Sequence, residues 1–153
     1  MGRRLARLEA LEVEMAELEK RLQRLVENHD TELTSIVGVA ALTAARILGR
    51  VGDPARFHSA AAFAMACGVA PIPASSGYTC RHRLNRGGDR QLNRALHTVA
   101  LVQSRSDPRA QAYIARKRAE GKSTREAIRC LKRHLADVVY RALQTPSKMT
   151  LTT

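Results

Sequence analysis

Aromatic residues are scarce in this sequence, which contains no Trp, two Phe and three Tyr among its 153 residues. Hydrophobic residues nevertheless make up 44% of the chain, so the core must be built mainly from Ala, Leu, Val and Ile. Such side chains suit closely packed helices better than a β-sandwich, which draws on aromatic and β-branched residues. We therefore predict an all-α fold, and the length leaves room for one compact domain with an appendage.

Long apolar runs and paired cysteines are also missing. No stretch approaches the roughly 20 apolar residues of a membrane span, and the charged N-terminus lacks the apolar segment of a secretory signal. The cysteines Cys67, Cys80 and Cys130 are odd in number and lack CxxC spacing, which indicates reduced thiols in the cytoplasm. Cys80 and His82 have no second ligand pair at zinc-site spacing. We expect no metal or other cofactor in this chain.

Acidic residues become few after the N-terminal segment. Residues 1–34 carry six Lys or Arg and eight Asp or Glu, a net charge of −2, whereas residues 35–153 carry twenty and six, a net charge of +14. A folded region this basic attracts polyanions, because neutralised phosphates release their counterions. A GC-rich genome would explain the preference for Arg over Lys, but not the uneven distribution. The charge predicts a nucleic-acid-binding surface within residues 35–153.

Residues 3–29 show the heptad pattern of a coiled coil. Apolar side chains recur at alternating spacings of three and four residues, at Leu8, Leu11, Met15, Leu18, Leu22 and Leu25. Three heptads are marginal as an isolated helix, so we expect pairing with a partner chain. Residues 1–30 are thus predicted to form a coiled-coil oligomerisation helix of a homodimer or higher oligomer, in either orientation. The alternative is an amphipathic helix packed on the domain's own core.

The rest of the chain is divided by Gly, Pro and capping residues into further helices. We expect a short helix, a Gly turn and a longer helix within 31–50, and helices over 58–67, 89–104, 108–120 and 123–143. Residues 69–89 are predicted to form a long loop bearing Ser and Arg, and an irregular stretch of this length usually serves a function or is disordered. Residues 31–145 would make up the compact helical domain, and 146–153 a flexible tail.

The segment around Gly38 is typical of a helix-hairpin-helix element, which binds DNA without regard to sequence. Its Gly turn would let backbone amides approach a phosphate, and the N-terminus of the following helix, near Ala40 and Thr43, would add its dipole. Ala40 stands where such motifs usually have a second Gly. A plain helical hairpin is the alternative.

The predicted loop holds Ser75, Ser76 and Gly77, and a run of arginines follows it. A hydroxyl on a glycine-bearing loop within reach of guanidinium groups is the arrangement for phosphoryl transfer through a serine ester, because the cations neutralise charge in the transition state. Ser-Ser-Gly is also ordinary loop composition. The arginines of this cluster are Arg81, Arg83, Arg86, Arg90 and Arg94.

Six basic residues near the C-terminal end recur at spacings of three and four, as a stripe on a helical surface would. Such a stripe predicts contacts with a DNA or RNA backbone, and a solvated basic face is the alternative. Its members are Arg118, Lys122, Arg125, Arg129, Lys132 and Arg133.

In their order along the chain, several short motifs resemble the C-terminal, serine-bearing domain of the IS110 family of insertion-sequence transposases, which act as RNA-guided recombinases. The similarity covers about residues 33–143. The motifs that carry it are Ile36-Val37-Gly38-Val39 with Leu42-Thr43-Ala44, Gly52-Asp53-Pro54-Ala55-Arg56-Phe57, Gly68-Val69-Ala70-Pro71, Ser75-Ser76-Gly77, Asn85-Arg86-Gly87-Gly88-Asp89-Arg90 with Leu92 and Arg94, and Asp107-Pro108.

The resemblance implies a mechanism in which the loop serine attacks a DNA phosphate and forms a covalent phosphoserine intermediate. Ser76, which precedes the Gly, matches the family's nucleophile best, and Ser75 is the second choice. Arg86, Arg90 and Arg94 would hold the phosphate, and a structured guide RNA would be a further partner.

This sequence departs from the family pattern in one respect. Family members carry an RNase H-like domain whose four acidic residues hold divalent metal beside the serine, and no such acidic set occurs in this sequence. We therefore expect the chain to be inactive unless that domain is supplied, and expect metal only with it. The alternatives are a catalytically silent, dimeric nucleic-acid-binding module and a regulator of a full-length transposase. Each would act in the bacterial cytoplasm, at the nucleoid when bound.

Overall fold

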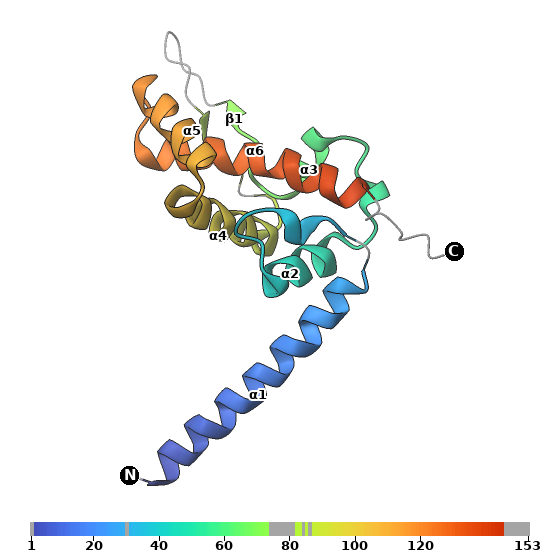
Figure 1. The fold of residues 1–153 in the computed structure, drawn as a ribbon. Coiled ribbons are helices and arrows are strands. Elements are labelled where there is room, and N and C mark those ends of the chain that lie inside the picture. Colours follow the sequence, from blue (N-terminus) through green and yellow to red (C-terminus); the bar gives the residue numbers. More distant parts are fainter. Residues whose placement is uncertain (1, 30, 74–81, 84, 86, 146–153) are drawn as a thin grey trace, which may run out of the picture.

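The protein is described by a computed structural model that covers residues 2–29, 31–73, 82, 83, 85 and 87–145. Within these residues the fold is built from helices, which confirms the predicted all-α class (Figure 1). The α-helices are α1 (Gly2–Glu27), α2 (Ala41–Val51), α3 (Ala60–Ala66), α4 (Arg90–Ser106), α5 (Pro108–Ala119) and α6 (Thr124–Gln144). Two 3₁₀ turns, η1 (Leu33–Ser35) and η2 (Pro54–Arg56), and a two-residue antiparallel pair, β1 (Ile72–Pro73) with β2 (His82–Arg83), complete it.

Side-chain caps fix the helix boundaries close to where the sequence predicts them. Ser59 accepts a hydrogen bond from the Ala62 amide at the start of α3, and the Asp89 carboxylate accepts two from the first turn of α4. Asp107 caps α5, and Ser123 opens α6 with a reciprocal capping box. Each cap satisfies amides that have no partner inside the helix.

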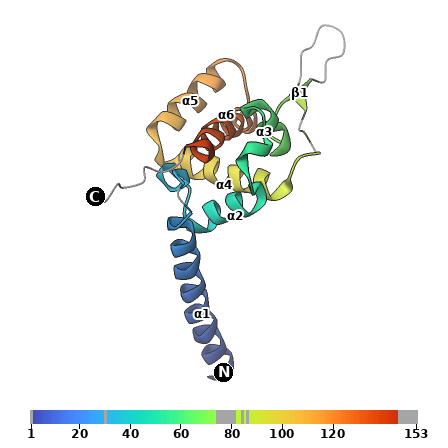
Figure 2. The ribbon, with the colours of Figure 1, turned by 90° about the vertical axis from the view of Figure 1, so that its right-hand side faces the viewer.

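Helix α6 forms the centre of the core, with α3, α4 and α5 packed around it (Figures 1 and 2). Its Leu131, Leu135 and Val139 are buried, and small buried alanines on these helices allow their backbones to approach closely. None of the helices in the described residues is long and apolar enough to cross a membrane.

The few aromatic residues are concentrated at one place in this core. Phe63 packs edge-on against Phe57, with ring centroids 5.2 Å apart, and lies 5.8 Å from the ring of Tyr140. The Tyr140 hydroxyl donates a hydrogen bond of 2.9 Å to the Phe57 carbonyl. These contacts join η2, α3 and α6 where aliphatic side chains alone would leave gaps.

Helix α1 extends away from the domain, and its predicted seam is exposed (Figures 1 and 2). Only its C-terminal end joins the core, through the buried Val26 and the half-buried Leu22. The alternative of a helix packed along its length on its own domain is therefore wrong. The remaining seam residues are 43–64% exposed, namely Leu8, Leu11, Met15, Leu18 and Leu25.

Two backbone segments far apart in sequence meet at the end of α3. The Asp89 amide donates to the Ala66 carbonyl at 2.6 Å, and Gly88 lies directly against Gly68. A Cβ at Gly88 would stand 2.2 Å from the Gly68 nitrogen, so only Gly fits at this position. This contact closes the base of the long loop.

Replacing Gly88 with Ala should lower the free energy of unfolding by about 3 kcal/mol, because backbone rather than a movable side chain meets the new methyl group. Gly49→Ala is the matched control: a Cβ there meets nothing within 4 Å, so it should stabilise α2 by about 0.5–1 kcal/mol. Denaturant unfolding of both variants measures the difference. Equal stabilities of Gly88→Ala and the parent would contradict the packing described.

Candidate nucleic-acid interface

The two stems of the loop predicted to carry the nucleophile are held by backbone pairing and by a side-chain hydrogen bond. Its two stems pair as β1 and β2, with Ile72 opposite Arg83 and Pro73 opposite His82. Below the strands, the Asn85 side-chain amide donates to the Met65 carbonyl at 3.1 Å. The predicted Ser75, Ser76, Arg81 and Arg86 lie outside the described residues, and for Arg83 only the backbone is described.

Asp89 ties this base to two helices. Its Oδ1 accepts from the amides of Gln91 and Leu92 at 2.8 and 3.0 Å, and its Oδ2 accepts from Arg50 Nε of α2 at 2.8 Å. Burial alone would raise the pKa of Asp89, but the bonds from Arg50 and the two amides outweigh it and lower the pKa.

Asn93, one turn further along α4, connects the base to α6. Its Nδ2 donates to the carbonyls of Cys67 and Gly68, at 3.1 and 2.9 Å. Its Oδ1 accepts from Nζ of Lys132 at 2.6 Å. The facing edges of α4 and α6 are therefore joined beside the stem that leads into β1.

This contact brings together basic residues from two regions that the sequence analysis treated separately. Arg90 and Arg94 flank Asn93 on α4, while Arg125 and Arg129 precede Lys132 on the same side of α6. All four arginines are exposed, and none forms an ion pair within the described part of the chain. We call these four residues the α4–α6 edge.

His97 lies one turn beyond Asn93 and adds to this surface. Its pKa is lowered, first by burial and then by the positive charge of Lys132. Its imidazole therefore favours the neutral form, and the arginines supply the positive charge of the edge.

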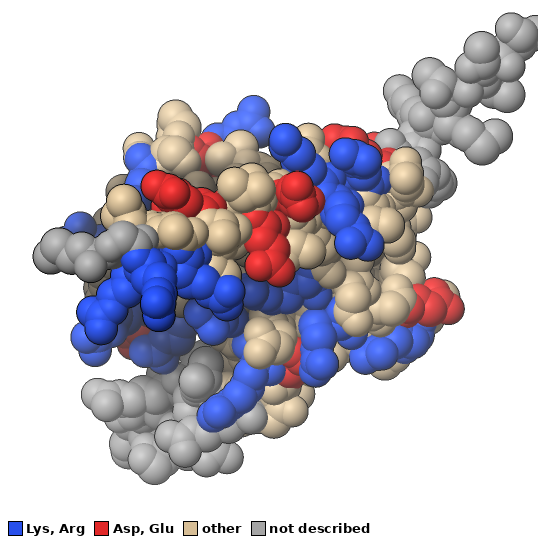
Figure 3. All heavy atoms as spheres, turned by 90° about the horizontal axis from the view of Figure 1, so that it is seen from below, with Lys and Arg blue, Asp and Glu red and all other residues tan. Residues whose placement is uncertain are grey.

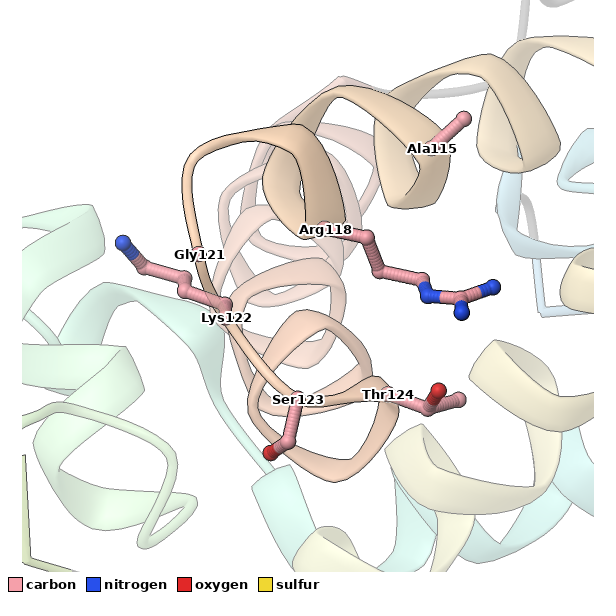
Figure 4. Close-up of a pocket in the computed structure, with 6 residues that line it drawn as sticks. All are labelled: Ala115, Arg118, Gly121, Lys122, Ser123 and Thr124. Atoms are coloured by element: carbon pink, nitrogen blue, oxygen red, sulfur yellow. The ribbon is translucent and has the colours of Figure 1, made fainter.

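The remaining members of the predicted stripe do not form one continuous surface. Arg118, in the last turn of α5, and Lys122, in the turn that follows, line a shallow hollow and point in opposite directions (Figure 4). Lys122 lies 3.6 Å from Glu120, and Arg133 forms a 2.5 Å ion pair with Asp137.

Lys132 differs most from the expectation. The spacing places it on the basic surface, but its side chain is buried, with 7% of its area exposed. Burial, followed by the nearby Arg129, lowers its pKa. Lys132 lies at the boundary between the exposed face of α6 and its buried face. The two faces are separated by a fraction of a helical turn, and residue spacing alone does not show on which of them a boundary residue lies.

The segment around Gly38 has the predicted order of short helix, turn and helix, in η1 and α2. Gly38 has a φ of +86°, and a Cβ there would lie 3.2 Å from the Val102 side chain and 3.3 Å from the Val99 carbonyl. Gln103 of α4 also donates to the Val37 carbonyl at 2.7 Å. Close packing on α4 thus explains why Gly is needed at this turn.

The N-terminus of α2 remains open to solvent contacts. Ala40 is the N-cap residue and gives no side-chain hydrogen bond, and no acidic residue lies in the first turn, which contains Thr43. The helix-hairpin-helix interpretation of Gly38, Ala40 and Thr43 stays a prediction.

Basic side chains are unevenly distributed over the molecular surface. Seen along the view of Figure 3, Lys and Arg gather in clusters over part of the face, with fewer Asp and Glu between them. This agrees with the excess of positive charge after residue 34 and gives a polyanion several places to bind.

Sequence reasoning did not single out Asn93 and His97. Both lie in the middle of an amphipathic helix, where a polar residue is usually solvated. Their spacing of four residues from Asp89 and from each other is the only signal that they share one side of α4 with the cap.

The sequence is also similar to known proteins. The family model described as "Transposase IS116/IS110/IS902 family" matches residues 30–115, more than half of the chain. The chain therefore belongs to this transposase family, and the resemblance drawn from its motifs is confirmed.

Two curated relatives come from insertion elements. The chain is 36% identical over 140 residues to a 43.6 kDa protein of insertion element IS110 from Streptomyces coelicolor, covering 90% of this chain and 35% of the relative. It is 35% identical over 131 residues to a 42 kDa protein of insertion element IS900 from Mycobacterium paratuberculosis, covering 84% and 32%. The chain spans about a third of the length of these relatives.

Asp89→Asn tests the electrostatic part of the loop base. Asn still caps a helix but loses the charge that binds Arg50, so the variant should be less stable at neutral pH by about 1 kcal/mol. The folded-state pKa lies below the ordinary 3.8, so the stabilisation is complete above that value and lost as the pH falls through the folded pKa.

Unfolding curves recorded from neutral to acidic pH should therefore converge for the parent and Asp89→Asn. Asp107→Asn, at a cap without an ion pair in the described residues, is the control and should differ little from the parent. A pH-independent loss in Asp89→Asn would show that the charge has no role.

Proposed function

We propose that this chain is the nucleic-acid-binding, serine-bearing part of an IS110-family transposase, and that it binds the phosphate backbone of DNA along the α4–α6 edge. The observation that carries the proposal is the contact between Asn93 and Lys132, which sets the four exposed arginines beside the stem of the loop that holds Ser75 and Ser76. Phosphate binding and phosphate attack would then take place on adjoining surfaces.

The state of the arginines supports this assignment. Arg50 and Arg133 are engaged by carboxylates, whereas the arginines of the α4–α6 edge keep their guanidinium groups free of carboxylates in the described residues. A free guanidinium can donate two parallel hydrogen bonds to phosphate oxygens. Backbone contacts of this type hold DNA in register without specifying its sequence.

In the proposed reaction the Ser76 hydroxyl oxygen attacks a DNA phosphorus. A serine–phosphate bond forms, the bond from phosphorus to one deoxyribose oxygen breaks, and the serine proton leaves to a base. Arginines, including Arg81, Arg83 and Arg86 of the loop, would neutralise the charge that builds on the phosphate oxygens. Ser75 is the second choice as nucleophile. Divalent metal would come with an acidic domain such as the resemblance implies.

Exposure of the α1 seam supports self-association in the same proposal. Five large apolar side chains of the α1 seam are exposed, and their burial against a partner would stabilise the helix. We propose that residues 1–30 pair two or more copies, so that two DNA strands can be held by one assembly. The domain over 31–145 would then carry the DNA contacts, with residues 146–153 as a tail.

A second candidate is a regulator that binds nucleic acid without chemistry. The exposed seam favours it, because the same stripe could pair with a longer relative and give an unproductive assembly. A structured guide RNA is the other polyanion that the α4–α6 edge would suit, and competition between RNA and duplex DNA in a binding titration separates the two.

The DNA-binding proposal is tested by salt titration of binding to a labelled duplex. Four phosphate contacts give a slope of log K against log salt of about −3.6, or about 10²-fold weaker binding at 200 than at 50 mM salt. Arg94→Gln and Arg129→Gln should each make the slope shallower by about 0.9. Arg109→Gln, an equal charge change on α5 away from the edge, should leave the slope unchanged, and equal effects of all three would contradict a defined edge.

Pairing through α1 is tested by light scattering of Leu11→Glu and Leu18→Glu. Each places a charge in the seam and should convert the oligomer to a monomer, because a charged side chain cannot be buried there unpaired. Val13→Glu is the matched control, since Val13 is 61% exposed but lies outside the seam. A monomeric parent protein, or equal dissociation by Val13→Glu, would refute the coil.

A further inference from the structure

Lys132 is a buried cation without an acidic partner. No ion pair of the described residues includes it, and its one hydrogen bond runs 2.6 Å to the Asn93 side-chain oxygen. The neighbouring titratable groups are basic, with Arg129 on its own helix and His97 across from it on α4. Burying such a charge costs free energy, so the hydrogen bond to Asn93 is the interaction that compensates part of this cost.

The role of Lys132 follows from the hydrogen bonds that the Nδ2 group of Asn93 donates. Both Nδ2 hydrogens are used on consecutive carbonyls, those of Cys67 and Gly68. A side-chain amide can present either its oxygen or its nitrogen to a neighbour, and a lysine ammonium group can donate a hydrogen bond only to the oxygen. Lys132 therefore fixes the amide so that its donors must face the backbone at the end of α3.

The backbone held in this way leads directly into β1. Gly68, with a φ of +67°, lies against Gly88, and the adjoining Ala66 carbonyl accepts from the Asp89 amide. One amide thus secures the crossing point from which both stems of the loop start. A charge-assisted hydrogen bond of this length is among the stronger ones available to a protein.

We infer that Lys132 and Asn93 are positioning residues, which hold the stems of the serine-bearing loop in a fixed place relative to the arginines of the α4–α6 edge, and that Lys132 does not itself contact phosphate. The consequence for catalysis rests on the proposed function. The placement of the stems does not rest on the proposed function, because the hydrogen bonds that connect Lys132 through Asn93 to Gly68 all lie within the described residues.

Two measurements on the full chain separate positioning from phosphate contact. Lys132→Met keeps the aliphatic bulk but frees the Asn93 amide, so hydrogen exchange of backbone amides in residues 66–73 and 87–89 should become about tenfold faster. Its salt slope for DNA binding should equal that of the parent. Arg129→Gln should do the reverse: a slope shallower by about 0.9 and unchanged exchange in the stems.

Asn93→Asp is the second variant, in case Lys132→Met does not fold. Its carboxylate still accepts from Lys132 but cannot donate to the two carbonyls, so the same stem amides should exchange about tenfold faster. Asn28→Asp makes the same charge change at an exposed position of the α1 end and serves as the control.

The outcomes decide whether Lys132 positions the stems or contacts phosphate. A shallower salt slope in Lys132→Met overturns the inference in favour of phosphate contact, and unchanged stem exchange in Asn93→Asp overturns it as well. Uniformly faster exchange throughout the chain would mean that the substituted residue stabilises the whole fold rather than the stems, and also overturns the inference. Failure of the parent chain to bind DNA at low salt would refute the proposed function, while the exchange measurement would still decide the positioning role.

Discussion

The close approach of the end of α3 to the segment before α4 organises the part of the domain that holds the loop stems. Gly88 can touch Gly68 only because neither has a side chain, and that contact places the Asp89 amide on the Ala66 carbonyl. Asp89 then caps α4 and binds Arg50, while Asn93 reaches back to the same crossing point. The loop stems, α2, α4 and α6 are thereby fixed to one another through a few bonds.

Charge alone would not have identified a binding surface in a chain with so many basic residues. Geometry separates arginines paired with carboxylates and a buried lysine from exposed arginines that have no ion pair in the described residues. An exposed arginine of this kind can exchange water for phosphate without first losing a protein partner. The arginines of the α4–α6 edge lie on the two helices that Asn93 and Lys132 join beside the stem of the loop.

Sequence patterns predicted the helices well because the helix ends are determined by local sequence. Capping residues such as Ser59, Asp89 and Ser123 and the Pro at the start of α5 mark them. The heptad in α1 was equally readable, and its exposure follows from the absence of a partner surface on the domain. The burial of Lys132 and the role of Asn93 were not predictable, because they depend on how α4 meets α6. Gly38 shows the same limit: the pattern marked it correctly as special, but its closest neighbour is Val102, on a helix sixty residues later.

Formation of a covalent protein–DNA adduct tests the central claim most directly. The chain would be incubated with duplex DNA, magnesium and a separately supplied acidic domain from a family member, and then run on a denaturing gel. We expect an adduct with the parent chain and with Ser75→Ala, and none with Ser76→Ala. An adduct that persists in Ser76→Ala but not in Ser75→Ala would move the nucleophile by one residue. DNA binding without any adduct in the parent chain would contradict a catalytic role and leave a binding module.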